Sequence, residues 1–399
     1  MNNSVKGLDK TLLENKLIDS ILGCIYGNVL GDAYGLSVEF LDFIKIRQLY
    51  ADENTMIPFP DFYPNRHNMR WTKGDWTDDS DQMILIMQMF ISTGGQVDLL
   101  DVGKRLKAWI KQGFPELGDV AGLGLGQTVG SVVYSPEFDK DPVLCSKAFW
   151  EKTGRNMAAN GATMRTSIIG CVDFTNQEQV KDNTIKLAHL THYDIRCSIS
   201  SIMVTLVISG ILTFYQKQLG DMNGIGGDSS NINVIQEKDI LEIMNKVEQV
   251  CQDVLYSAPD SEYSKEKKDE YWTEFQKHLN VEKIEDLNLD ESDKIGYTYK
   301  CFGSAVYSLR QILKNGSKLS FRKVIDTLIR QGGDTDTNAA VAGALIGATI
   351  GYQQLPSDML NSLPHKEWLD GIVVQFINKI ILKKPQESQS WFNWVKGFF

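Results

Sequence analysis

The sequence predicts an all-α protein, folded as a compact orthogonal bundle of many helices. Val, Ile and Thr are not gathered into short alternating runs between turn signals, which would indicate strands. Long apolar or amphipathic stretches follow one another instead, as expected for helices packed around a shared core. Two of these stretches carry glycine at every fourth position. The expected helices cover residues 17–36, 81–92, 98–111, 162–172, 178–190, 198–216, 238–256, 297–314, 320–331, 337–352 and 369–381.

The composition is that of a globular protein with a substantial core. The chain has 399 residues, of which 42% are hydrophobic and 23% are charged, and this length allows one large domain or two ordinary ones. We expect a single domain over 17–399, preceded by a polar N-terminal tail over 1–16. Residues 217–292 are rich in Gly, Asn, Ser and charged side chains, and we interpret them as a surface insertion. Within it, we expect 260–270 to be disordered.

The net charge of −10 argues against nucleic-acid or anionic-membrane partners, which require a basic surface. One apolar stretch, 198–215, approaches the length of a membrane span, but it contains several Ser and Thr residues and is predicted to be a buried core helix. The six cysteines are scattered without a CxxC pair, and residues 1–16 lack the apolar stretch of a signal peptide. These features predict reduced thiols and a cytoplasmic location.

The glycines at four-residue spacing require a structural explanation. A glycine inside a soluble helix costs about 1 kcal/mol relative to alanine. A stripe of small residues, however, allows two helix backbones to approach closely. We therefore expect helices 17–36 and 337–352 to lie deep in the core and to contact each other through their stripes. These are Gly23, Gly27, Gly31 and Gly35 in the first helix, and Gly343, Gly347 and Gly351, preceded by Ala339 and Ala340, in the second.

Two short acidic clusters, far apart in the chain, each open an apolar helix. They are Thr77-Asp78-Asp79-Ser80, and Asp334-Thr335-Asp336-Thr337 behind Gly332-Gly333. Each combines two carboxylates with hydroxyl groups, without Cys or His, and this ligand set suits Mg²⁺ or Ca²⁺ better than Zn²⁺. If both clusters face one pocket, their aspartates repel one another unless divalent cations neutralise them. A pair of bound ions is the simplest remedy, so the chain is interpreted as a metal-dependent enzyme.

Two other interpretations of these clusters explain less. Asp and Thr are good helix N-caps, but this accounts for neither the consecutive aspartates of the first cluster nor the Asp-x-Asp-Thr of the second. A DxDT string is also typical of phosphatases and phosphotransferases with an aspartate nucleophile, which place it at the end of an apolar strand. Here the preceding residues, 321–331, have the pattern of an amphipathic helix.

Five motifs are spread along most of the chain. They are GCIYGNVLGDAYGLSVEF at 23–40, WTDDSDQM at 76–83, NGATMR at 160–165, Thr191-His192, and GGDTDTNAAVAGALIG at 332–347. In kind and order they resemble those of the ADP-ribosylglycohydrolase family, which includes dinitrogenase reductase-activating glycohydrolases and eukaryotic ADP-ribosylhydrolases. The resemblance implies an all-α fold with a binuclear Mg²⁺ site at helix N-termini.

The resemblance also assigns ligands to that site. Four carboxylates against two Mg²⁺ ions leave a nearly neutral centre. The ions would hold hydroxyls of the distal ribose and a bridging water near its anomeric carbon. The ligands implied are Thr77, Asp78, Asp79, Asp334, Asp336 and Thr337.

Glu39 is the implied catalytic residue. It lies seven positions after Asp32, where family members acting on O-linked substrates carry an assisting glutamate. Cleavage of a ribosyl bond develops oxocarbenium-like charge and needs a protonated leaving group or an activated water, and a carboxylate near the metal can provide either. An ordinary surface glutamate past a helix end is the alternative. Asp32 is interpreted as a residue behind the ligands that orients metal-bound water or a neighbouring loop.

Two further segments carry candidates for substrate binding. The glycine loop AGLGLGQT could donate backbone N–H groups to the phosphates of ADP-ribose, although a plain turn explains it equally well. By resemblance, NGATMR lines the ribose and phosphate side, with Arg165 structural. Residues 156–159 lack the Ser-Tyr-Gly of some relatives, which puts ligand contacts from that loop in doubt. The candidates are Gly124, Gly126, Asn160, Gly161, Ala162 and His192.

The expected function is hydrolysis, by metal-bound water, of the ribosyl bond between ADP-ribose and a modified protein side chain, or of a related O- or N-linked conjugate. The expected partner is an ADP-ribosylated protein or ADP-ribose conjugate. The sequence leaves the oligomeric state open, with a monomer slightly favoured. The alternatives are a non-catalytic ADP-ribose-binding or structural protein on the same scaffold, and a metal-dependent phosphohydrolase. Arginine, serine, polymer and acetylated ADP-ribose all remain open as substrates, as does the role of 217–292.

Overall fold

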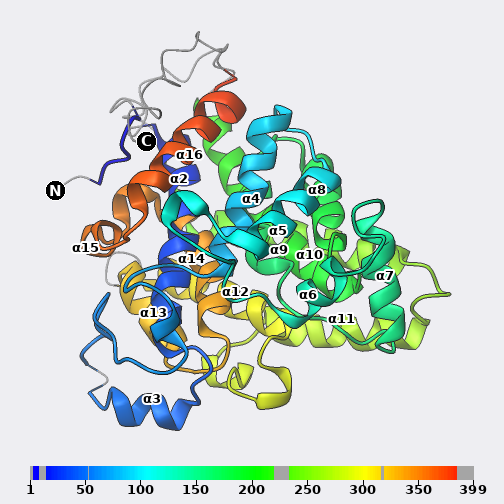
Figure 1. Ribbon diagram of the computed structural model, residues 1–399, viewed down its shortest axis with the longest axis horizontal. Helices are drawn as coiled ribbons and strands as arrows, with labels where there is room; N and C mark the ends of the chain where they lie inside the picture. Colours follow the sequence, from blue (N-terminus) through cyan, green and yellow to red (C-terminus); the bar gives the residue numbers. More distant parts are fainter. Residues whose placement is uncertain (1–2, 9–14, 53, 220–232, 316–318, 384–399) are drawn as a thin grey trace.

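The computed structural model is predominantly helical over the residues that it describes, which are 3–8, 15–52, 54–219, 233–315 and 319–383 (Figure 1). These ranges contain no strand, and their isolated β-bridge joins Ala159 to Tyr297. The predicted all-α fold is confirmed. Residues 9–14 of the predicted tail, 220–232 of the predicted insertion and 384–399 at the end of the predicted domain lie outside the described residues.

Most predicted helices are present. They are α2 (Lys16–Gly35), α4 (Asp78–Thr93), α5 (Leu99–Gln112), α8 (Gln177–His189), α9 (Ile195–Leu219), α10 (Glu237–Ser257), α12 (Thr298–Asn315), α13 (Phe321–Ile329), α14 (Thr335–Ile350) and α16 (Lys366–Phe376). Helices absent from the prediction are α3 (Phe43–Leu49), α6 (Gln127–Val133), α7 (Pro142–Lys152), α11 (Lys265–Leu279) and α15 (Ser357–Asn361). Short 3₁₀-helices include η1 (Leu36–Val38), η2 (Asn68–Arg70), η3 (Pro115–Leu117), η7 (Ile284–Leu287), η8 (Ser292–Lys294) and η10 (Tyr352–Gln354), and a π-helical turn, η11 (Ile377–Ile381), extends α16.

Polar side chains begin many of these helices. Asp98 accepts hydrogen bonds from the N–H groups of Leu100 and Asp101 at the start of α5, and Asn176 and Ser320 cap α8 and α13 in the same way. Such caps satisfy N–H groups that have no partner within the helix. At the other end, α4 stops at Gly94 in the left-handed conformation.

The glycine helices α2 and α14 run antiparallel through the middle of the fold (Figure 1). A Cβ atom on Gly27 would lie 2.2 Å from the carbonyl oxygen of Gly343, and one on Gly23 would lie 2.0 Å from that of Gly347. Towards the end of α2, a Cβ atom on Gly31 would lie 1.9 Å from the oxygen of Ala339. No side chain fits between these backbones. The predicted contact through the glycine stripes is confirmed.

Most buried apolar residues of the described helices, including those of this pair, belong to one main hydrophobic core. Among the described residues, Ile195–Gln218 within α9 is the helix long and apolar enough to cross a membrane, and 89% of its most apolar window is buried inside the fold. The prediction of a buried core helix over 198–216 is confirmed. All six cysteines are buried and unpaired.

The prediction of a helix over 162–172 is wrong in type. The chain forms two 3₁₀-helices there, η4 (Thr163–Arg165) and η5 (Ser167–Cys171). Gly170 lies against α9 so closely that a Cβ atom on it would come within 2.5 Å of the Thr205 carbonyl oxygen. The segment is thus pressed onto a neighbouring backbone, and the tighter 3₁₀ turn fits that space.

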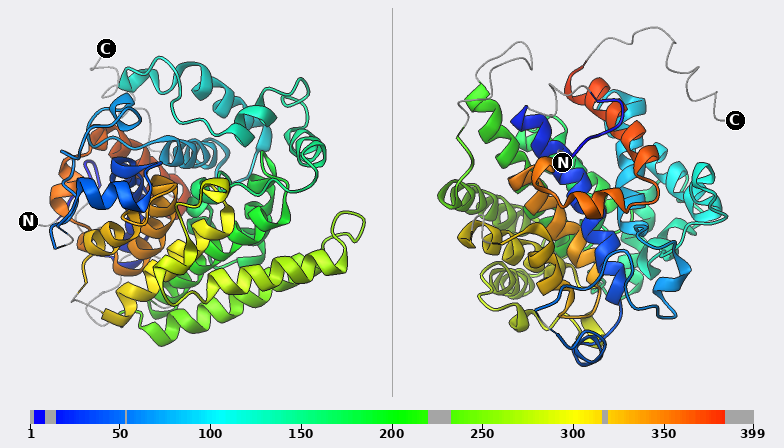
Figure 2. Two further views of the ribbon diagram at one scale, coloured as in Figure 1. Left: turned by 90° about the horizontal axis from the view of Figure 1, so that it is seen from below. Right: turned by 90° about the vertical axis from the view of Figure 1, so that its left-hand side faces the viewer.

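The expectation of disorder over 260–270 is also wrong. Ser264 caps α11, and Lys268, only 4% exposed, donates to the carbonyl oxygen of Tyr256 and pairs with Asp260. One face of α11 is mainly apolar and buried, and most of its charged residues lie on the outer side. Figure 2 shows α10 and α11 as long helices along one edge of the molecule. The buried apolar residues of this pair are Ile240, Met244, Val247, Cys251, Leu255, Tyr271, Phe275 and Leu279, and all belong to the main core.

Candidate metal centre

Three helix ends meet at one end of the α2–α14 pair. α2 finishes at Gly35, α14 starts beside it, and α4 starts opposite. Thr77 Oγ1 lies 3.3 Å from Asp336 Oδ2, although 259 positions separate the two residues in the sequence. Folding therefore brings the two acidic clusters face to face.

Asp32, near the end of α2, holds the start of α4 in place. Its Oδ1 accepts hydrogen bonds from the backbone N–H and the hydroxyl of Thr77, at 3.0 and 2.9 Å. Its Oδ2 accepts from the backbone N–H and the hydroxyl of Ser80, at 2.9 and 2.6 Å. Asp32 thus caps α4 from a neighbouring helix, with both oxygens engaged.

The acidic clusters are not used as N-caps by their own helices. Thr77 and Asp334 occupy the N-cap positions of α4 and α14, but neither side chain makes a capping hydrogen bond. Asp78, Asp79 and Asp336 lie in the first helical turns, where the positive end of the helix dipole favours negative charge. Their carboxylates are therefore free to face the centre.

The carboxylates form two groups that share one residue. Single oxygens of Asp32, Asp79 and Asp336 lie within 4.8 Å of one another, and the same holds for Glu39, Asp334 and Asp336. Asp79 Oδ1 is buried and has no hydrogen-bond partner. A buried acceptor without a partner is costly, and a cation would satisfy it.

Burial and mutual repulsion oppose ionisation of this cluster. Burial raises the pKa of Asp32 to about 7, although its hydrogen bonds to Ser80 and Thr77 counteract this. Burial, followed by the charges of Glu39, Asp79, Asp334 and Asp32, raises the pKa of Asp336 well above its usual value. Burial is also the first cause that raises the pKa values of Asp78, Asp79 and Asp334, and the charges of neighbouring carboxylates add to it. Bound divalent cations would reverse these shifts by stabilising the charged forms.

Glu39 follows η1 and is almost fully buried, with 6% of its surface exposed. Its carboxylate points towards Asp334 and Asp336 and also lies 2.6 Å from the Nε2 atom of His67. The structure thus makes Glu39 part of the centre and not a surface residue past a helix end. His67 was not identified from the sequence, because it stands alone in a stretch that has neither helical nor strand periodicity.

Asn160 and Gly124 also reach the acidic centre. Asn160 Nδ2 donates to Asp334 Oδ2 at 2.8 Å. Gly124 has a φ of +95°, and a Cβ atom on it would lie 2.3 Å from Asp78 Oδ1, so glycine is required for both conformation and space. Gly126, at the start of α6, is exposed, and a Cβ atom on it would have no neighbour within 4 Å.

The other substrate-binding candidates are buried in the protein interior. They are Gly161, Ala162 and His192. A Cβ atom on Gly161 would lie 2.9 Å from the His192 ring, and Ala162 is fully buried in a small cluster with Ala158 and Cys197. His192 is 2% exposed, and burial lowers its pKa well below the usual value. These residues therefore support the backbone at Asn160 from inside the protein.

Hydrogen bonds between buried polar side chains connect Thr191, the neighbour of His192, to Asp78. Gln82 donates to Asp78 Oδ2 at 2.8 Å and accepts from Arg165 at 2.9 Å. Arg165 in turn donates to the hydroxyl of Thr191 at 2.6 Å. The structural role expected for Arg165 agrees with this arrangement. Gln82 was missed, and its signal was its position four residues after Asp78, which places both side chains on one face of α4.

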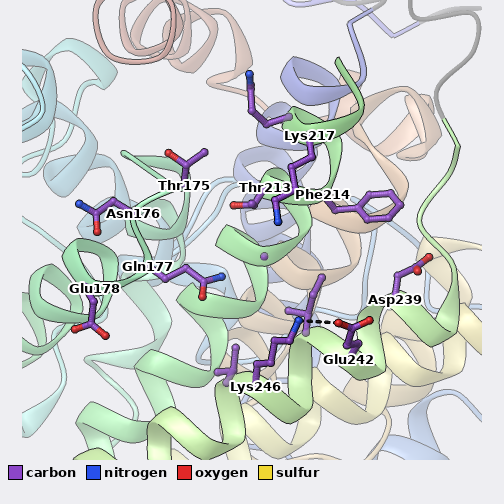
Figure 3. A pocket seen from close by; sticks show the side chains of 14 residues that line it. Thr175, Asn176, Gln177, Glu178, Thr213, Phe214, Lys217, Asp239, Glu242 and Lys246 are labelled. Carbon is purple, nitrogen blue, oxygen red and sulfur yellow. Dashed lines mark hydrogen bonds and ion pairs between the residues drawn. The ribbon is translucent and has the colours of Figure 1, made fainter. Parts of the chain in front are cut away.

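A large cavity lies elsewhere, between α8, α9 and α10 (Figure 3). Its volume is about 1160 Å³, and its lining includes Asn176, Thr213, Lys217, Glu242 and Lys246. None of the acidic residues of the metal centre lines it.

The fold and the shared acidic centre define a helical protein with a buried carboxylate cluster, able to hold metal ions, at converging helix ends. The ADP-ribosylglycohydrolase family model matches residues 13–386, and the chain belongs to this family. An uncharacterized protein of Archaeoglobus fulgidus is 23% identical over 358 residues, which cover 88% of this chain and 94% of that protein. ADP-ribosylhydrolase ARH3 of Mus musculus is 22% identical over 381 residues, covering 91% and 92% respectively. A solved structure described as an ADP-ribosylglycohydrolase-related protein complex has the same fold, with a TM-score of 0.57, 17% identity, and coverage of 91% of this chain and 98% of its own.

Proposed function

We propose that the protein is a Mg²⁺-dependent hydrolase that cleaves the ribosyl bond between ADP-ribose and a modified protein side chain, or a related O- or N-linked conjugate. The observation that carries this proposal is the pair of carboxylate groups that share Asp336. Two cations that share a carboxylate are a common arrangement in hydrolytic enzymes. Membership of the family supports ADP-ribose conjugates as the class of substrate.

The residues present fit magnesium. Each residue proposed as a metal ligand offers a carboxylate or hydroxyl oxygen, and Mg²⁺ prefers oxygen ligands. The unpartnered Asp79 Oδ1 supplies a buried acceptor for a cation. When bound, the ions would polarise the substrate and lower the pKa of a water molecule. The residues proposed to hold two ions are Thr77, Asp78, Asp79, Asp334, Asp336 and Thr337.

Glu39 is the proposed proton-transfer group. In hydrolysis, a water oxygen bonds to the anomeric carbon, the bond to the side chain breaks, and the side chain regains a proton. The Glu39 carboxylate lies at the acidic centre, within 4.8 Å of oxygens of Asp334 and Asp336, where it can accept the proton of the water or protonate the leaving group. Asp32 and Asn160 orient α4 and Asp334 through the hydrogen bonds described above.

We propose that the loop of Gly124 and Gly126 and the segment of Asn160, Gly161 and Ala162 bind ADP-ribose, with His192 behind them. The closeness of Gly124 to Asp78 and of Asn160 to Asp334 supports this, because both segments then border the metal ligands. The buried, unpaired cysteines support a reducing, cytoplasmic setting.

Incubation with arginine- and serine-ADP-ribosylated peptides, with and without Mg²⁺, tests the proposal. Mass detection should find free ADP-ribose only when Mg²⁺ is present, and should identify the linkage that is cleaved. The double variant Asp78→Asn, Asp336→Asn should abolish this turnover and retain its helical circular dichroism spectrum. Binding of ADP-ribose without release from any peptide would favour a non-catalytic binder. Release of inorganic phosphate from nucleotides would favour a phosphohydrolase.

A further inference from the structure

We propose that His67 is a positioning residue that holds the carboxylate of Glu39 in its reactive orientation. The inference rests on the proposed function, because it concerns a residue of the same site. His67 Nε2 lies 2.6 Å from Glu39 Oε2. A carboxylate can only accept, so the imidazole donates from Nε2, and this short hydrogen bond fixes one Glu39 oxygen.

The ring of His67 is itself held between aromatic side chains. The Phe40 ring meets it edge-on, at a centroid distance of 4.9 Å and an interplanar angle of 75°. The Trp71 ring lies 5.1 Å away on a tilt of 47°, and the Arg70 guanidinium covers Trp71 at 4.9 Å. Packing of this kind restricts a ring to one rotamer. His67 therefore presents Nε2 from a fixed place.

The backbone around His67 is tied to the segment that carries Glu39. Asn65 Oδ1 accepts hydrogen bonds from the N–H groups of His67 and Asn68, both at 2.8 Å. Asn68 Nδ2 then donates to the carbonyl oxygen of Ser37, at 3.1 Å, two positions before Glu39. One turn of the chain thus fixes both the backbone before Glu39 and the side chain of Glu39.

The backbone after Glu39 is fixed to the second acidic cluster. Phe40 adopts a φ of +60°, which is uncommon for a bulky residue, and its N–H donates to the carbonyl oxygen of Gly333 at 2.8 Å. Gly333 directly precedes Asp334. Glu39 is therefore held on both sides, by the turn of His67 and by the loop of the metal ligands.

Amide and hydroxyl groups orient the neighbouring carboxylates Asp78, Asp334 and Asp32, whereas an imidazole contacts Glu39. Gln82 holds Asp78, Asn160 holds Asp334, and hydroxyl and amide groups hold Asp32. His67 is also more accessible than the residue it contacts, with 23% of its side chain exposed against 7% for Glu39. It orients Glu39 from outside the acidic centre.

The test compares His67→Phe, which keeps the aromatic packing, with His67→Gln, which restores an N–H donor. If His67 positions Glu39, His67→Phe lowers kcat by about 10–100-fold, as loss of an orienting partner typically does, with KM and the calorimetric affinity for ADP-ribose little changed. His67→Gln recovers most of the rate. In the Glu39→Gln background, His67→Phe has no further effect, because a residue that acts through Glu39 is silent once Glu39 is removed.

His278→Phe is the matched control. His278 is also an imidazole among aromatic rings, with Tyr297, Tyr299 and Phe302 around it and a hydrogen bond to the Glu274 carbonyl oxygen. Its variant should keep the wild-type kcat. Equal rates for His67→Phe and wild type, or an additive loss in the double variant, overturn the proposal for His67. Failure of the wild type itself to release ADP-ribose is a failure of the proposed function instead. A shift of the His67 Nε2 NMR resonance in Glu39→Gln provides a reading that is independent of activity.

Discussion

Gly35 of α2 lies directly against Asp336 of α14. A Cβ atom on Gly35 would come within 2.4 Å of the Asp336 Cα atom. Thr335 strengthens this contact, because its hydroxyl donates to the Gly35 carbonyl oxygen at 2.7 Å. The stripe that joins the two core helices therefore ends at the residue that both carboxylate groups share. The register of the glycine helices determines where the acidic clusters meet.

Substitution Gly27→Ala tests this register. A methyl group there would lie 2.2 Å from a backbone oxygen, and the backbones would have to separate. We expect a loss of about 3 kcal/mol or more in the free energy of unfolding, at the upper end of overpacking effects. Gly371→Ala in α16 is the control, since it has no neighbour within 4 Å, and should stabilise by about 0.5–1 kcal/mol. Denaturant unfolding measures the change in the free energy of unfolding for both variants. Equal changes would contradict the close backbone contact at Gly27.

Substitution Asp336→Asn should stabilise the metal-free protein and remove its stabilisation by Mg²⁺. The variant eliminates one buried charge from a repelling group. Wild type, by contrast, should gain about 2.7 kcal/mol at a Mg²⁺ concentration about 100 times its Kd. Thermal unfolding with EDTA or Mg²⁺ measures both effects.

Asp326→Asn is the contrast for that variant. Asp326 is equally buried, but it pairs with Arg330 at 2.8 Å. Removal of one partner from a buried ion pair typically costs about 3–5 kcal/mol. Asp326→Asn should therefore destabilise the protein with or without Mg²⁺. Destabilisation of the metal-free protein by Asp336→Asn would contradict the prediction. It would show that groups of the protein already neutralise the charge of Asp336.

The stability of the metal-free protein should fall as pH rises from about 4 to above 7. The pKa of Asp32 rises from 3.8 to about 7 on folding, and other carboxylates of the centre shift in the same direction. The folded state thus binds more protons than the unfolded state in this range, so the contribution of these groups to stability is greatest below about pH 4 and is lost through about pH 7. The melting temperature of wild type relative to Asp336→Asn, in EDTA, isolates this effect. A difference that does not grow between about pH 5 and pH 8 would contradict it.

Substitution Gly124→Ala should weaken Mg²⁺ binding. Its methyl group would lie 2.3 Å from Asp78 Oδ1, so the ligand has to move, and we expect at least about a tenfold loss of affinity. Gly154→Ala is the matched control: Gly154 also has a positive φ, of +76°, but no neighbour within 4 Å. Both variants carry the same kind of backbone strain, and only the first disturbs Asp78. Titration calorimetry with Mg²⁺ distinguishes them.

The sequence was informative where a local pattern has one physical explanation. Glycine at every fourth position in a soluble helix implies a close backbone contact, and the structure shows that contact. Paired aspartates at two helix starts predict a shared acidic centre, and the structure brings the two clusters together. The sequence was uninformative where a residue acts through a distant partner. His67 and Asn68 lie at the start of the short helix η2, in a stretch of sequence without periodicity, and nothing local indicates that they hold Glu39 and Ser37.

Charge was misleading in α11. Its lysines and glutamates suggested disorder, yet Tyr271, Phe275 and Leu279 recur at four-residue spacing and are buried. The apolar stripe was present in the sequence but was outweighed by the charged face. Over 162–172, the hydrophobic pattern indicated a helix but could not distinguish an α-helix from the 3₁₀ turns that fit against α9.

The central claim is that both acidic clusters bind the same cations, and a crystal structure with Mn²⁺ in place of Mg²⁺ tests it most directly. The anomalous difference map should show two peaks between the two acidic clusters, both close to Asp336, which the structure places near Asp79 and near Asp334. A map without density at Asp336, or with a metal held by one cluster alone, would contradict the account.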